Sequence, residues 1–185
     1  MRTLLITGIL LVHGAAWAQA PQHPAVSYNF AELRFVDLDQ GGGDGFRLNG
    51  SYRFEGNWLV VGGITRLDFN NNVDSTTIEL GGGYVWPYRN DWDFLANVRL
   101  VRTDVDFPLG SADDTGIGLT GGVRGLITPS FEIRGSINHI NLDNSDTYLE
   151  LGCDYYFTRN FAAGLSVEFA GDSDAWTLGA RWYFR

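Results

Sequence analysis

The sequence contains no lysine, a single cysteine and, beyond its first twenty residues, no long apolar run. The lone Cys153 excludes an intramolecular disulfide framework. The 13 basic residues are all arginine, and 22 acidic residues bring the formal net charge to −9, which argues against a nucleic-acid partner. Because no remaining apolar stretch reaches the length of a transmembrane helix, a helical membrane protein is excluded as well.

The first twenty residues have the three parts of a secretory signal peptide. Met1 and Arg2 form a short positive region, residues 4–12 an apolar core, and residues 18–20 (AQA) a small-x-small cleavage site. This core is too short to span a bilayer, and no cysteine follows the cleavage site as a lipid anchor would require. We therefore predict a cleaved signal peptide at 1–20 and one exported domain at 21–185, since no linker or low-complexity segment divides the rest.

The remaining chain alternates between apolar and polar residues in segments of about ten residues. The clearest segment is GFRLNGSYRF at 45–54, and the chain closes on another, DAWTLGARWYFR at 174–185. A period of two places one kind of side chain on each face of a strand. We count ten such segments, with eight as the alternative, and predict an all-β fold: a single up-and-down antiparallel transmembrane β-barrel.

The connections between these segments fall into two alternating classes. Tight turns lie at 55–56, 87–90, 128–130 and 158–160, and longer acidic loops lie at 37–45, 70–74, 104–114, 142–146 and 171–174. Outer-membrane barrels have short periplasmic turns and longer extracellular loops. With an even number of strands, this rule places both termini on the periplasmic side.

Steric fit and charge decide which face points inward. The many aromatic side chains would overfill the small lumen of a ten-stranded barrel, and they gather near both sets of connections, as the aromatic girdles of a membrane barrel do. A soluble lipocalin-like barrel or sandwich is the alternative. The other face is rich in Gly, Ser, Thr and Asn and carries balanced charges, as buried charges must be paired. We predict a lumen charge network of Glu32, Arg34, Arg47, Arg53, Arg66, Glu79, Asp93, Arg99, Arg124, Glu132, Arg134, Glu150, Asp154, Glu168 and Arg181.

The chain resembles the small outer-membrane β-barrel proteins of Gram-negative bacteria, a group that includes the OmpA-transmembrane, OmpX and opacity types. Its segments DGFRLNGSYRF at 44–54 and SDTYLELGCDYYFT at 145–158 are similar to hairpins of short-loop members. The resemblance implies a location in the cell outer membrane, in contact with its lipid and lipopolysaccharide. It also implies that the barrel-assembly machinery recognises the last strand, through Trp176, Leu178, Trp182 and Phe184. The chain departs from the pattern in that Arg185 follows the terminal aromatic residue.

No residue pattern predicts catalysis, a cofactor or a metal centre. The loops contain no histidine of the kind that outer-membrane proteases use, and Asn141 stands where a lipid A deacylase would have a serine after His139. Cys153 is expected mid-strand facing lipid, as a small apolar residue. The acidic loops fit either divalent-cation binding or simple turn formation, and the first loop lacks the glutamate of a calcium loop.

Two functions of different classes remain open. The paired charges favour a plugged barrel with a structural or surface role. The inward glycines favour the alternative, a narrow porin-like channel for small solutes. The short loops offer little adhesive surface, so we expect the structural barrel, and no subunit interface can be read from the sequence.

Overall fold

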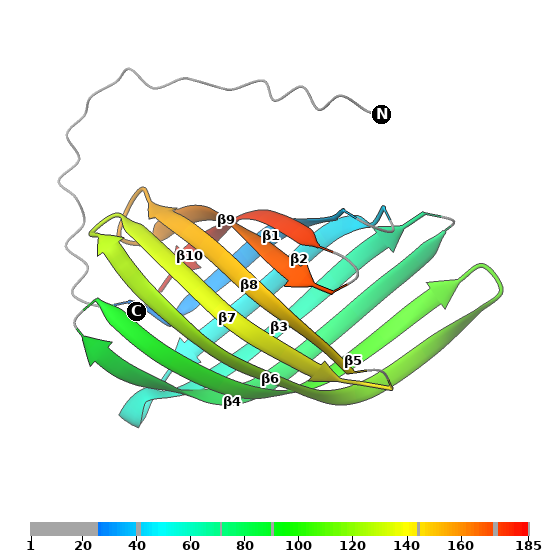
Figure 1. Cartoon of the computed structure of the whole chain (residues 1–185), viewed down its shortest axis with the longest axis horizontal. Coiled ribbons are helices and arrows are strands. Elements are labelled where there is room, and N and C mark those ends of the chain that lie inside the picture. The colour runs from blue at the N-terminus through cyan, green and yellow to red at the C-terminus, as the bar shows by residue number, and fades with distance from the viewer. Residues whose placement is uncertain are drawn as a thin grey trace, which may run out of the picture.

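The computed structural model describes residues 26–39, 42–70, 72–89, 91–143, 145–171 and 174–184. In these ranges ten strands form one closed antiparallel barrel in which each strand pairs with its neighbours in sequence (Figure 1). The strands are β1 (Phe30–Leu38), β2 (Asp44–Arg53), β3 (Trp58–Phe69), β4 (Val73–Arg89), β5 (Trp92–Phe107), β6 (Gly110–Thr128), β7 (Phe131–Asn141), β8 (Ser145–Tyr156), β9 (Phe161–Ala170) and β10 (Ala175–Tyr183). The predicted fold and the count of ten are confirmed. The predicted signal peptide and Arg185 lie outside the described residues.

The barrel closes between its first and last strands. Phe30 of β1 lies opposite Ser51 of β2 on one side and opposite Tyr183 of β10 on the other. Every strand therefore has two hydrogen-bonded neighbours, and the sheet has no free edge. A short helix, η1 (Glu55–Asn57), forms a single turn between β2 and β3. Among the residues that the structure describes, no helix is long and apolar enough to cross a membrane.

The two ends of the barrel differ in their connections. Tight turns join β2 to β3, β4 to β5, β6 to β7 and β8 to β9 at one end, which we call the short-turn end. The described chain begins and ends there, because the amide of Phe184 donates a hydrogen bond to the carbonyl of Asn29 (3.0 Å). The opposite end, which we call the acidic end, carries the aspartate-rich connections. The two chain ends thus share one side of the barrel, as the even strand number requires.

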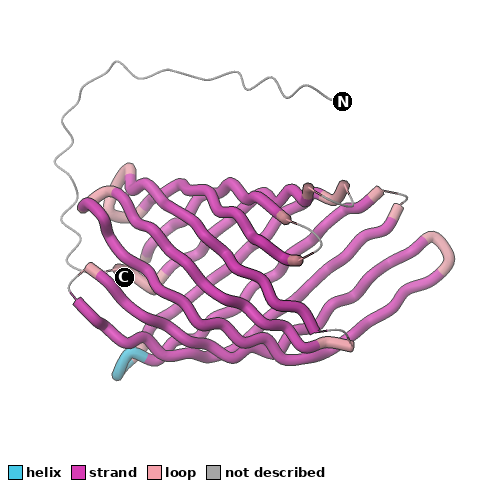
Figure 2. Tube along the Cα trace, viewed as in Figure 1, coloured by secondary structure: helices cyan, strands magenta, loops and turns pink. Residues whose placement is uncertain are grey.

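The segment 104–114 is not the loop that its composition predicts. β5 and β6 continue through it as paired strands and turn only between Phe107 and Gly110. The hairpin reaches beyond the neighbouring strands at the acidic end (Figures 1 and 2). Aspartate is disfavoured in strands because of its local hydrogen bonding, yet here the backbone ladder with the partner strand outweighs that preference.

The outer face of the barrel is a continuous apolar surface. Leu80 and Leu100 are 63% and 66% exposed, and large apolar side chains of all ten strands share this face. An apolar area of this size far exceeds what a water-soluble monomer exposes. Aromatic clusters border this surface. Near the short-turn end, the ring centroids of Trp58 and Trp86 each lie 5.0 Å from that of Tyr84. The face therefore suits a lipid bilayer.

A row of aspartates crosses five neighbouring strands on the outer face at the acidic end. The register places Asp37 opposite Asp44, Asp44 opposite Asp68, Asp68 opposite Asp74, and Asp74 opposite Asp106. Side chains that oppose each other across an antiparallel pair have Cβ atoms about 4.5–5.5 Å apart. Like charges at that separation repel; Arg66 offsets part of this repulsion at Asp68 and Asp74, which leaves a cost in stability around Asp37 and Asp44 at low ionic strength.

We predict that Asp44→Asn raises the free energy of unfolding by up to about 1 kcal/mol at low salt, because it removes the charge between Asp37 and Asp68. Urea unfolding of the refolded protein in lipid vesicles measures the change, and added salt should reduce it. Asp143→Asn, outside the row, is the control and should have a smaller effect. A destabilised Asp44→Asn variant would contradict the prediction.

Candidate functional site

The lumen holds almost all of the charged residues predicted for it. Alternation along each strand directs their side chains inward, because the opposite positions carry the apolar outer face. The inward positions are those of Glu32, Arg34, Arg47, Arg53, Glu79, Asp93, Arg99, Arg124, Glu132, Arg134, Glu150, Asp154, Glu168 and Arg181.

Arg66 is the exception, and its predicted place in the lumen is wrong. On β3 the inward residues are Leu59 and its odd-numbered successors, so Arg66 faces outward. It lies at the acidic end, where its guanidinium is 3.7 Å from Asp68 and 3.8 Å from Asp74. The alternation of 57–69 is ambiguous because apolar residues occupy both faces. Val60 and Ile64 face outward, whereas Leu59, Val61 and Leu67 face inward, so polarity alone does not identify the inward face.

Four arginines and four carboxylates form one connected network inside the barrel. Its most buried member is Glu132, whose carboxylate accepts hydrogen bonds from Arg124 Nε (2.8 Å) and Nη2 (3.0 Å). The hydroxyl of Tyr156 donates to the same carboxylate (2.5 Å). Arg181 Nη1 lies 3.5 Å from Glu132 and so joins this cluster to the rest.

The network continues towards the acidic end through Arg34. Its guanidinium donates to Glu32 Oε1 (2.5 Å) and to Asp154 Oδ1 (3.2 Å), and Arg181 Nη2 donates to Glu32 as well (3.1 Å). Arg134 pairs with Asp154 and extends the network to Glu150 (3.3 Å). Each buried charge thus has opposite charges within reach, which offsets part of the cost of removing it from water.

Two further ion pairs lie in the lumen outside this network. Arg99 donates to Glu79 (2.7 Å), and Arg47 pairs with Glu168. The pair Arg47–Glu168 joins β2 to β9, and the pair Arg34–Asp154 joins β1 to β8. Both therefore span the seam where β1 meets β10.

Two glycines make room for the pair that crosses the lumen wall. In register, Arg34 lies opposite Gly179, Gly179 opposite Gly164, and Gly164 opposite Asp154. A Cβ atom on Gly179 would lie 2.5 Å from Arg34 Cγ, and one on Gly164 would collide with the Asp154 carboxylate. Side chains on β9 and β10 at these positions would block the contact between Arg34 and Asp154.

An apolar plug at the short-turn end is the feature that sequence reasoning missed. The segment Val26–Asn29, ahead of β1, enters the barrel mouth, where Val26 and Tyr28 are each 3% exposed. They belong to one apolar cluster with inward side chains of eight strands: Phe30, Leu59, Val61, Val85, Leu95, Leu126, Tyr156, Ala162 and Tyr183. Arg124 holds the segment: it donates to the carbonyl of Ser27 (3.1 Å) and lies 4.7 Å from the ring of Tyr28. The signal available in the sequence is Val26 and Tyr28 extending the inward alternation of β1 beyond its first residue.

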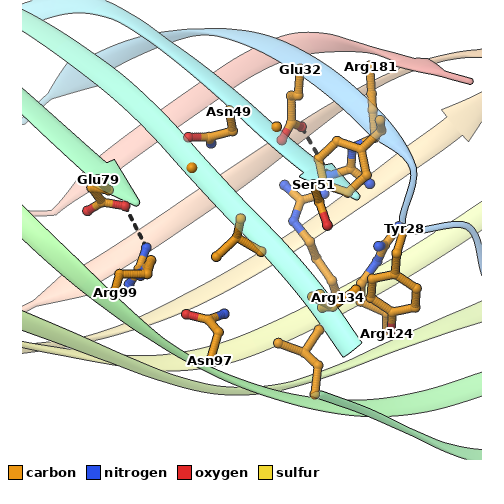
Figure 3. Close-up of a pocket in the computed structure, with 16 residues that line it drawn as sticks. Tyr28, Glu32, Asn49, Ser51, Glu79, Asn97, Arg99, Arg124, Arg134 and Arg181 are labelled. Carbon is orange, nitrogen blue, oxygen red and sulfur yellow. Dashed lines mark hydrogen bonds and ion pairs between the residues drawn. The ribbon is translucent and has the colours of Figure 1, made fainter. Parts of the chain in front are cut away.

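A cavity of about 190 Å³ lies in the lumen next to this plug. Figure 3 shows Glu79 and Arg99 on one side of it, and Arg124, Arg134 and Arg181 on the other. Tyr28 of the plug is part of its wall. Within the described residues, no group of three or more His, Cys, Asp or Glu side chains is arranged to hold a metal ion.

The other predicted residues lie on the outer face. Trp176, Leu178 and Trp182 of β10, followed by Phe184, are exposed there. Cys153 faces the same way, half-buried and unbridged. His139 Nδ1 lies 2.8 Å from Thr147 Oγ1, across the pair β7–β8.

Comparison with known proteins agrees with the architecture. No protein-family model matches the chain, and no curated protein sequence does. The fold and the apolar outer face are those of a membrane-type β-barrel, and the expected resemblance to the small outer-membrane barrels is confirmed at the level of the fold. Two solved structures of this class are the NanC porin (TM-score 0.55, 9% identity, 83% of this chain and 100% of that chain covered) and the KdgM porin (TM-score 0.53, 13% identity, 84% and 99% covered). The KdgM porin has also been solved in complex with disordered oligogalacturonate (TM-score 0.52, 13% identity).

We predict that Glu132→Gln lowers the free energy of unfolding by about 3–5 kcal/mol, because it leaves Arg124 buried without its carboxylate. Urea unfolding in vesicles measures the loss. Arg102→Gln, which removes an exposed ion pair with Asp104 at the acidic end, is the control and should leave stability nearly unchanged. Equal effects of the two substitutions would contradict the prediction.

Proposed function

We propose that this chain is an integral outer-membrane barrel with a closed lumen and a structural role in the cell envelope. The observation that carries the proposal is the set of side chains inside the lumen. The apolar plug of Val26 and Tyr28 packs into the short-turn end, and the charge network occupies the middle. An open porin keeps a water-filled path along its axis.

In this proposal the acidic end faces outward from the cell and the short-turn end faces the periplasm. Both termini are then periplasmic, in line with the short periplasmic turns of outer-membrane barrels. The apolar face contacts outer-membrane lipid, and the row of aspartates lies at the level of the lipopolysaccharide head groups.

A narrow porin-like channel is the second candidate. The cavity of about 190 Å³ beside Arg99 and Arg134 supports it, since the lumen is not filled throughout. The likeness to the NanC and KdgM porins supports it too, though only through the fold. For such a channel to conduct, the segment Val26–Asn29 has to leave the mouth of the barrel.

Single-channel recording of the refolded mature chain in a planar bilayer separates the two candidates. A closed barrel gives a silent bilayer, although the protein is folded and heat-modifiable on gels. A channel gives discrete steps whose size changes in a variant with Glu79→Gln and Glu150→Gln, because both carboxylates face the lumen. Such steps from the unaltered chain would overturn the proposed closed barrel.

We predict that a chain lacking residues 21–29 conducts ions, because this deletion removes the plug and connects the cavity to the short-turn end. A chain lacking only residues 21–25 retains Val26 and Tyr28 and serves as the matched control, which should stay silent. Conductance is compared at equal amounts of folded, heat-modifiable protein. Silence of both variants would mean that the charge network alone closes the lumen.

We also propose that the outward residues Trp176, Leu178, Trp182 and Phe184 present the last strand to the barrel-assembly machinery. Phe184→Ala should slow assembly into vesicles that contain this machinery by several-fold, while unassisted folding into detergent changes little. Leu165→Ala, an outward substitution on β9, is the control. Equal slowing of both variants would argue against a signal in the last strand.

A further inference from the structure

A groove of about 880 Å³ crosses the lipid-facing surface near the short-turn end. Outward side chains from the end of β2 to β6 form its walls: Phe54, Trp58, Val60, Tyr84, Trp86, Val98 and Leu119. Gly82 and Ala96 lie between these walls. The volume falls within the range of about 300–1,000 Å³ that is typical of ligand sites. Water needs several polar partners to occupy a hollow, so an apolar group has to fill this one in a bilayer.

The small residues of this groove are not required by the backbone. A Cβ atom on Gly82 would lie 3.4 Å from the carbonyl oxygen of Leu59, an ordinary contact. One on Gly121, which lies opposite Ala96, would meet nothing within 4 Å. On the inward face of β4, by contrast, a Cβ atom on Gly81 would lie 2.0 Å from a carbonyl oxygen of β5. Glycine weakens a strand. Because larger side chains would fit at Gly82 and Gly121, their small size serves to keep the outer surface hollow.

The aromatic wall sets the direction of the groove in the bilayer. Trp58, Tyr84 and Trp86 lie at its short-turn side, and such rings gather at the level of the lipid head groups. From there the groove extends towards the middle of the bilayer between Val98 and Leu119, which are opposite each other in register. A lipid molecule has this same arrangement, with its head at the interface and its chain below. A second barrel fits less well, because the same concave patch on both partners of a two-fold pair would leave the hollow empty.

The rim of the groove carries exposed charges of both signs. Arg89 follows Trp86 by three residues on β4, and its guanidinium lies 5.2 Å from the ring centroid of Tyr88. Glu55 lies in η1, which is next to β4, and Asp91 lies in the turn after β4. Neither Arg89 nor Glu55 has an ion-pair partner among the described residues. A cation and a carboxylate are thus free beside the same groove.

We propose that this groove is a binding site for one phospholipid with a primary-ammonium head group. Its acyl chain fills the groove, its phosphate pairs with Arg89, and its ammonium donates hydrogen bonds to Glu55. Arginine binds phosphate oxygens well, and a primary ammonium has three N–H donors for a carboxylate, whereas a quaternary ammonium has none. The inference goes beyond the proposed function, since it rests on the lipid-facing surface and not on a closed lumen.

Native mass spectrometry tests the site, because it separates bound lipids by mass. The refolded mature barrel is measured in detergent micelles that contain equal amounts of phosphatidylethanolamine, phosphatidylcholine and phosphatidylglycerol. We expect one phosphatidylethanolamine per barrel, at several-fold higher occupancy than either other lipid. Equal occupancy by all three lipids, or a two-copy complex without lipid, would overturn the proposal. The same sample is tested for heat-modifiability on gels, so a folded barrel without lipid counts against this site alone.

Two alanine substitutions test where the chain binds. Ala96→Phe fills the groove from a position that already has a Cβ atom, and lipid occupancy should fall about tenfold. Ala163→Phe is the matched control, since Ala163 is an outward alanine of β9 away from the groove. An equal loss in both variants would contradict the site.

Two further substitutions test the head-group contacts. Glu55→Gln should lower phosphatidylethanolamine occupancy about threefold and leave phosphatidylglycerol unchanged, because only the former has an ammonium. Arg89→Gln should lower the occupancy of all three lipids, since each has a phosphate. Unchanged lipid preference in the folded Glu55→Gln variant would contradict the assigned head group.

Discussion

The hydrogen-bond closure between β1 and β10 is the constraint on which the rest of the structure depends. Lipid offers no hydrogen-bond partners to the backbone, so a sheet can cross it only as a ring without edges. Ten strands complete that ring, with β1 paired to both β2 and β10. The period of two then divides all side chains between a lipid face and a narrow interior. Charged side chains that lie between the two ends of the barrel therefore have to point into the lumen.

The interior explains why arginine is used and lysine is absent. A guanidinium presents donors on several edges in one plane and can bind two carboxylates at once, whereas an ammonium acts as a compact point charge. Arg34 contacts Glu32 and Asp154 together, and Arg134 contacts Asp154 and Glu150. One arginine can therefore pair with carboxylates that belong to different strands.

Much of this architecture could be predicted from the sequence, because lipid outside and a filled lumen inside impose a strict alternation on every strand. The partners of each charge could not be predicted, since they depend on the stagger of strands around the ring. Arg34 reaches Asp154 only because Gly179 and Gly164 lie between them. The plug also escaped sequence reasoning, since Val26 and Tyr28 precede the first strand and their burial depends on side chains from eight strands. The outward position of Arg66 could not be predicted either, because apolar residues lie on both faces of β3.

The ion pairs across the seam tie the chemistry of the lumen to the order of assembly. Arg34, Arg47 and Arg181 find Asp154, Glu168 and Glu32 across the line where the first strand meets the last. Before that line closes, Arg34 and Arg47 are cross-strand neighbours of like charge with no carboxylate from the far side of the barrel. An unclosed sheet therefore combines unpaired backbone with electrostatic repulsion, and both are relieved in the same event. Closure of this barrel is consequently cooperative, with partly closed intermediates kept scarce by the charges that later fill the lumen.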